Sequence, residues 1–77
     1  MNQTTTTTQF AFRRGWLHVM NKDMKLVRRE IMKSLKIETR MAFHQRMTGK
    51  VEPKVTEAKA IEAVFARVGL TDIWGWE

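Results

Sequence analysis

The sequence predicts an all-α fold, a small helix-turn-helix bundle of three to four helices preceded by a flexible N-terminal arm. Apolar residues recur at spacings of three and four along three segments between residues 21 and 68. Gly49, Pro53 and Gly69 punctuate those segments where helices commonly end. The 77-residue chain has no cysteine, so its stability has to come from helix packing or from association of copies.

The N-terminal part divides into two stretches. Residues 1–9 are polar and contain five consecutive threonines, which predicts a disordered tail. Residues 10–19 are interpreted as an arm or short helix, and residues 20–77 as the helix-turn-helix domain. In an alternative interpretation, residues 1–19 are an extension with no role in the fold.

The periodicity of residues 10–19 is ambiguous. Phe10 and Phe12 alternate as in a strand, whereas Phe12, Trp16 and Val19 fit one helix face, and Gly15 weakens both patterns. We favour a short helix or an extended arm that docks through Phe12 and Trp16.

The first long helix should end near Leu35. Asn21 or Asp23 can cap its N-terminus. Its apolar stripe is Met24, Val27, Ile31 and Leu35, and its other faces carry Lys22, Lys25, Arg28, Arg29 and Lys33.

The second helix should begin near Glu38 or Thr39, with Thr39 at its cap. Phe43 and Met47 lie one turn apart on it, and Gly49 can take the left-handed conformation that helix ends often need.

A third helix is expected after Pro53, with Thr56 as its cap and Glu57 in its first turn. Gly69 closes it. Its buried stripe should be Ile61, Val64, Phe65 and Val68.

The positive charge is concentrated in the middle of the chain. From Arg13 to Lys54 there are twelve Lys and Arg residues and four acids, whereas the remaining C-terminal part is net acidic, within a total of +6. This asymmetry favours a polyanion as partner. No apolar run is long enough for a membrane span, and the N-terminus MNQTTTTTQ lacks the pattern of a secretion signal, so we expect a cytoplasmic protein without membrane contact.

The second helix has the two edges that a DNA-reading helix needs. Phe43 and Met47 supply an apolar edge for the core, and the other edge is polar and long enough to reach bases. The candidate base-reading residues are Thr39, Arg40, Met41, His44 and Gln45. The candidate phosphate contacts are Arg28, Arg29, Lys36, Arg46, Lys50 and Lys54.

Four short motifs carry a resemblance to a known family. They are LKI at 35–37, ETR at 38–40, TGK at 48–50 with Pro53 four residues after Gly49, and VGL at 68–70. In this order they resemble phage-repressor-like, Cro/CI-type helix-turn-helix domains over about residues 24–70. The resemblance implies a DNA-binding domain whose helix 39–48 enters the major groove, and a source in a phage or mobile element.

Two details of the match stay open. Lys36 stands where the family has a turn glycine, so a left-handed turn there carries a Cβ penalty that a longer turn would avoid. Counting from Leu35 and from Gly49 disagrees by one residue, so the first base-facing pair is Arg40 with Met41 or Thr39 with Arg40.

An enzyme is not expected. His18 and His44 are 26 positions apart, and no paired acids, activated nucleophile or glycine-rich phosphate loop is present. We therefore expect no metal, no cofactor and no small-molecule ligand. Trp74 and Trp76 either complete the chain's own core or form a homodimer contact, and we favour the dimer contact because so short a chain builds little core.

The sequence thus favours a sequence-specific double-stranded DNA-binding protein, a transcriptional regulator or accessory factor. A first alternative is a protein-protein interaction module that uses the Trp-rich C-terminus and the aromatic N-terminal arm. A second is a basic amphipathic segment that lies on anionic membrane or RNA.

Overall fold

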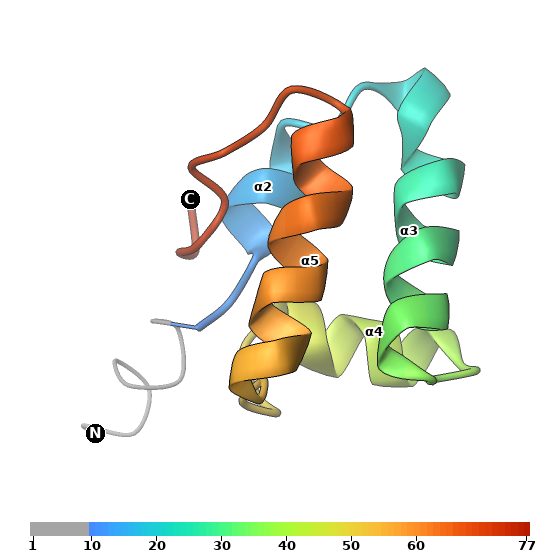
Figure 1. Ribbon diagram of the computed structural model, residues 1–77, viewed down its shortest axis with the longest axis vertical. Helices are drawn as coiled ribbons and strands as arrows, with labels where there is room; N and C mark the ends of the chain where they lie inside the picture. Colours follow the sequence, from blue (N-terminus) through green and yellow to red (C-terminus); the bar gives the residue numbers. More distant parts are fainter. Residues whose placement is uncertain (1–9) are drawn as a thin grey trace.

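The structure, a computed structural model, describes residues 10–77, and the disordered tail expected for residues 1–9 lies outside this range. The described residues contain four α-helices and no strand (Figure 1). In chain order the helices are α2 (Arg13–Leu17), α3 (Asn21–Leu35), α4 (Arg40–Met47) and α5 (Val55–Arg67). The predicted all-α bundle of three to four helices is confirmed.

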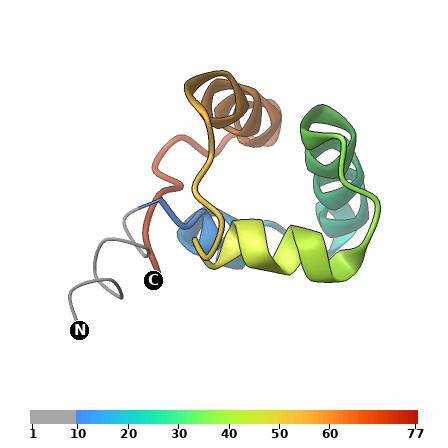
Figure 2. The ribbon, with the colours of Figure 1, turned by 90° about the horizontal axis from the view of Figure 1, so that it is seen from below.

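The two longest helices form the body of the bundle. α3 and α5 pack against each other, and α4 crosses below their lower ends (Figures 1 and 2). α2 lies at one end of α4. The side chains buried between the helices are Phe12, Val19, Val27, Ile31, Leu35, Phe43, Met47, Ile61, Val64, Phe65 and Ile73. The apolar stripes predicted for the three longer helices supply most of this core.

The three longer helices end in the same way. Just past each end a residue takes a left-handed conformation, Lys36 with φ 58°, Gly49 with φ 86° and Gly69 with φ 82°. The next amide N–H then donates to a carbonyl in the last turn: Ile37 to Met32 at 3.0 Å, Lys50 to Gln45 at 2.9 Å, and Leu70 to Phe65 at 3.0 Å. This hydrogen-bond pattern satisfies carbonyls that a helix end leaves unpaired. The turn after α3 is therefore left-handed at Lys36 despite the Cβ.

The segment before α3 belongs to the core. Phe12 is fully buried, and its ring contacts those of Phe43 at 5.7 Å and Phe65 at 5.8 Å. The short-helix interpretation is confirmed by α2, and the alternative of an extension with no role in the fold is wrong for residues 11–19.

The C-terminal segment closes over α2. The amide N–H groups of Arg14 and Gly15 donate to the carbonyls of Gly75 (2.9 Å) and Ile73 (3.0 Å). The N–H of Gly75 in turn donates to the carbonyl of Ala11 at 2.6 Å. Two of the α2 amides that lack a partner within the helix are thus satisfied by residues 61 and 58 positions later. We call α2 and residues 70–77 together the terminal clasp.

The start of α5 differs from the prediction. The helix begins at Val55, so its N-cap position is Lys54 and not Thr56. The Glu57 carboxylate accepts a hydrogen bond from the backbone N–H of Lys54 at 2.9 Å. A carboxylate at this third helical position can satisfy the N-cap amide, as in the acidic half of a capping box.

Candidate nucleic-acid interface

The N-terminus of α4 is fixed by Thr39, as the sequence indicated. The Thr39 hydroxyl oxygen accepts a hydrogen bond from the backbone N–H of Ala42 at 3.1 Å. This hydroxyl therefore caps the helix, and it keeps its own proton for an external acceptor.

The inner face of α4 is anchored in the aromatic core. Phe43 is 5% exposed, and its ring meets those of Phe12 and Trp16 edge to face, the latter at 5.2 Å. Met47 is buried one turn later. Such contacts allow the helix little freedom to rotate about its axis, so they determine which residues face outward.

The outer face of α4 carries the predicted base-reading residues. Arg40, Met41 and His44 are exposed, with Met41 at 67%, and Gln45 is half-buried at the edge of the same face. None of the four side chains forms an ion pair or a side-chain hydrogen bond within residues 10–77. The structure thus brings these residues together on one face, with Thr39 at its N-terminal end.

The predicted phosphate contacts fall into two groups. Lys36 and Lys50 are exposed at the two ends of α4, and Arg29 and Lys54 are exposed on neighbouring elements. Arg28 is half-buried beside the core stripe of α3.

Arg46, unlike the other candidate phosphate contacts, is paired with an acid among residues 10–77. Its guanidinium donates to the Glu57 carboxylate at 2.8 Å, with the two side chains only 17% and 20% exposed. The hydrogen bond from Arg46, followed by that from the Lys54 amide, lowers the pKa of Glu57 below its ordinary value of 4.5. This pair ties α4 to the start of α5, and the Arg46 charge is already compensated inside the protein.

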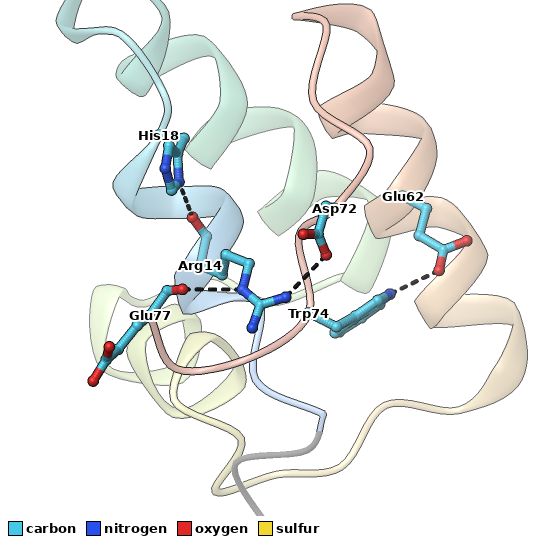
Figure 3. A network of polar contacts seen from close by, with 6 residues as sticks. All are labelled: Arg14, His18, Glu62, Asp72, Trp74 and Glu77. Carbon is cyan, nitrogen blue, oxygen red and sulfur yellow. Dashed lines mark hydrogen bonds and ion pairs between the residues drawn. The ribbon is translucent and has the colours of Figure 1, made fainter.

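Two further arginines have their partners within the terminal clasp, and Figure 3 shows one of them, Arg14. Arg14 donates from Nη1 to the Asp72 carboxylate at 2.9 Å and from Nε to the Glu77 carbonyl at 3.0 Å. Arg13 donates to the Trp76 carbonyl at 2.8 Å, and its guanidinium lies 4.4 Å from the centre of the Trp76 ring.

The two C-terminal tryptophans have different surroundings. Trp74 packs edge to face on Phe12 at 6.5 Å, and its indole N–H donates to the Glu62 carboxylate at 2.7 Å (Figure 3). Trp76 is 42% exposed. Of the two predicted dimer contacts, Trp76 therefore presents the larger open surface.

Between residues 10 and 77, no group of three or more His, Cys, Asp or Glu side chains lies close enough to hold a metal ion. None of the helices in this range combines the length and the apolar character that crossing a membrane requires.

The chain was also compared with known proteins. Neither protein-family models, nor curated proteins, nor solved structures gave a match.

Proposed function

We propose that this protein binds double-stranded DNA in a sequence-dependent manner and acts by occupying its site, as a transcriptional regulator or accessory factor in the cytoplasm. The observation that carries the proposal is the outer face of α4. Four side chains suited to base edges share that face, without partners in the described structure, while the inner face is fixed in the core. The family resemblance noted above supports a role in a phage or mobile element.

Each side chain of this face has a complementary group in the major groove. Arg40 can donate two hydrogen bonds to guanine, Gln45 can pair with adenine, and Met41 can pack on a thymine methyl group. His44 can donate to a base or a phosphate. Lys36 and Lys50 lie beyond the two ends of the helix, where positive charges would meet the phosphates that flank the groove.

The mechanism requires no reaction and no bound group. Occupancy alone blocks or recruits other factors at a site, so we propose no catalytic activity, no cofactor and no small-molecule ligand.

The decisive experiment is a salt titration of duplex binding. If about six phosphates are neutralised, affinity should fall roughly a thousandfold between 50 and 200 mM salt. A flat titration, or preference for single strands or anionic vesicles over duplex, would contradict the proposal and favour one of the two alternatives.

Specificity is tested on a duplex selected from a random library. Arg40→Ala and Gln45→Ala should reduce the preference for the selected duplex over random DNA by about 1 to 3 kcal/mol each. Lys50→Ala should weaken binding to both duplexes alike. Lys59→Ala, which removes an exposed cation of α5 that forms no ion pair with the described residues, serves as the matched control and should change neither.

We also propose that the protein binds as a homodimer through Trp76, because one recognition helix covers few base pairs and paired half-sites lie roughly 34 Å apart. Deleting the last six residues would remove the fully buried Ile73, so Trp76→Ser is the cleaner test. Sedimentation of the parent as a monomer at tens of micromolar would rule the dimer out.

A further inference from the structure

The outer face of α3 carries a continuous row of positive charge. Five exposed cations follow one another at spacings of three, four, four and three residues: Lys22, Lys25, Arg29, Lys33 and Lys36. We call this row the basic stripe. At 100° per residue, its four helical members fall within an arc of roughly 80°, and the stripe is about 20 Å long.

The stripe lies opposite the core. Val27, Ile31 and Leu35 point from the other side of α3 into the bundle. The two acids of α3 do not neutralise the stripe, because Glu30 is turned to α5, where Arg67 donates to it at 3.3 Å, and Asp23 lies half-buried in the first turn. In the described residues, no ion pair involves a member of the stripe.

Lys36 adds a second, independent observation. It is the one non-glycine residue with positive φ in the described part of the chain, and it occupies the position that Gly49 and Gly69 hold at the ends of α4 and α5. The left-handed conformation is unfavourable for a residue with a Cβ, and such strain tends to persist where a side chain has a function. At Lys36 the side chain that stands in place of a glycine carries the charge that links the stripe to α4.

The chemistry of the stripe points to one class of partner. It lacks the aromatic side chains on which single-stranded bases stack, and the apolar face of α3 is buried and cannot insert into a lipid surface. A row of cations along one helix instead matches the phosphates of a duplex backbone, which follow one another every 3.4 Å along each strand.

We propose that the basic stripe of α3 binds the sugar-phosphate backbone of the same duplex that α4 reads, outside the base pairs that α4 covers. The stripe ends at Lys36, in the turn that leads directly into Thr39 and α4, so the two surfaces are continuous. This inference rests on the proposed function in taking a duplex as the partner. It adds a second surface that contributes affinity without sequence preference.

The test compares two double variants with equal loss of charge. Lys25→Gln with Lys33→Gln alters the stripe, and Lys59→Gln with Arg67→Gln alters exposed cations of α5. Binding is measured on duplexes of about 8 and about 20 base pairs centred on the selected site, since the stripe is as long as roughly 6 base pairs. Thermal melting of both variants should match that of the parent, because all four side chains are exposed and the Arg67–Glu30 pair is a surface ion pair of little weight.

On the long duplex, the stripe variant should show a slope of log affinity against log salt that is shallower by about 1.8, or 0.9 for each lost phosphate contact. The control variant should keep the parent slope, and on the short duplex the two variants should bind alike. Equal slopes for the two variants on the long duplex would overturn the inference. The inference would also be overturned if the stripe variant lost equal affinity for the short and the long duplex. Capture of a second, labelled duplex that depends on the stripe would overturn it as well. If the parent itself shows no salt-dependent duplex binding, the proposed function fails instead, so the two failures are distinguishable.

Discussion

The terminal clasp and the outer surfaces of α3 and α4 use the same residue types in opposite ways. In the clasp, Arg13 and Arg14 have partners within the chain: backbone carbonyls, the Asp72 carboxylate and the face of Trp76. On α3 and α4, Arg29 and Arg40 are exposed and form no ion pair with the described residues.

The contrast shows why charge counted along the sequence overstates the charge available to a partner. Both clasp arginines belong to the basic middle of the chain, and so does Arg46, which is paired with Glu57. Whether a cation stabilises the fold or remains available for DNA depends on where the fold places acids and carbonyls. Substitutions in the clasp should therefore change mainly the stability of the protein. Substitutions on the outer surfaces of α3 and α4 should change mainly its binding to DNA.

The largest effect should follow from removing the side chain on which the clasp is built. Phe12→Ala should cost about 3 to 5 kcal/mol and unfold much of so small a protein, because its ring fills the space between Phe43, Phe65 and Trp74. Chemical denaturation measures the loss. Phe10→Ala, at a residue 36% exposed, is the control and should change stability little. A Phe12→Ala protein as stable as the parent would contradict the view that the clasp stabilises the fold.

A smaller loss is expected from adding one methyl group inside the clasp. A Cβ at Gly15 would lie 2.6 Å from the Cβ of Ile73, so residues 72–77 have to move in Gly15→Ala. We expect a net loss of about 1 to 3 kcal/mol, although alanine is the better helix former. Leu17→Ala, at an exposed position of the same helix, should be nearly neutral. If Gly15→Ala instead stabilises the protein, the clasp is not tightly packed.

These clasp contacts could not be predicted from the sequence. They join residues 58 to 64 positions apart, mostly through backbone carbonyls, and such contacts leave no periodic pattern. Helix periodicity and capping are local, so the long helices, the Thr39 cap and the left-handed Gly49 were predicted correctly. Thr56 was wrong as the cap of α5 because the helix already begins at Val55, where the Glu57 carboxylate accepts from the Lys54 N–H.

The candidate site was predictable to a similar degree. The outward face of α4 follows from the position of its apolar residues, and Arg40 and His44 are on that face. The pairing of Arg46 with Glu57 depends on how α5 crosses α4, which the sequence does not specify. The row of exposed cations on α3 can be recognised in the sequence from its spacing of three and four residues. The structure adds that the two acids of α3, Asp23 and Glu30, lie outside this row.

The Arg46–Glu57 ion pair should make the stability of the protein depend on pH. This dependence distinguishes a cation paired within the fold from the exposed cations of α3 and α4. Because the pKa of Glu57 is lowered in the folded state, its contribution to stability is complete above its unfolded pKa, near 4.5, and is lost as the pH falls through the folded pKa. Glu57→Gln should therefore lower stability by about 1 kcal/mol at pH 7, and the difference from the parent should shrink towards zero at low pH. Denaturation at several pH values measures it, with the exposed Glu52→Gln as control. A difference that does not depend on pH would mean that the pair contributes through packing and not through charge.

The smallest effect concerns Lys36, because the same residue carries backbone strain and a charge of the basic stripe. Lys36 adopts a left-handed conformation that suits glycine, and its charge belongs to the basic stripe. Lys36→Gly should therefore raise stability by about 0.5 to 1 kcal/mol, as the relief of strain exceeds the extra entropy of the unfolded chain. At the same time, its binding to duplex DNA should weaken, with a salt slope shallower by about 0.9. Lys36→Gln separates the two effects, because it loses the charge but keeps the Cβ, so it should bind as weakly as the glycine variant without the gain in stability. If the glycine variant is more stable and binds as tightly as the parent, Lys36 lies outside the DNA contact, and the strain at the end of α3 has no role in binding.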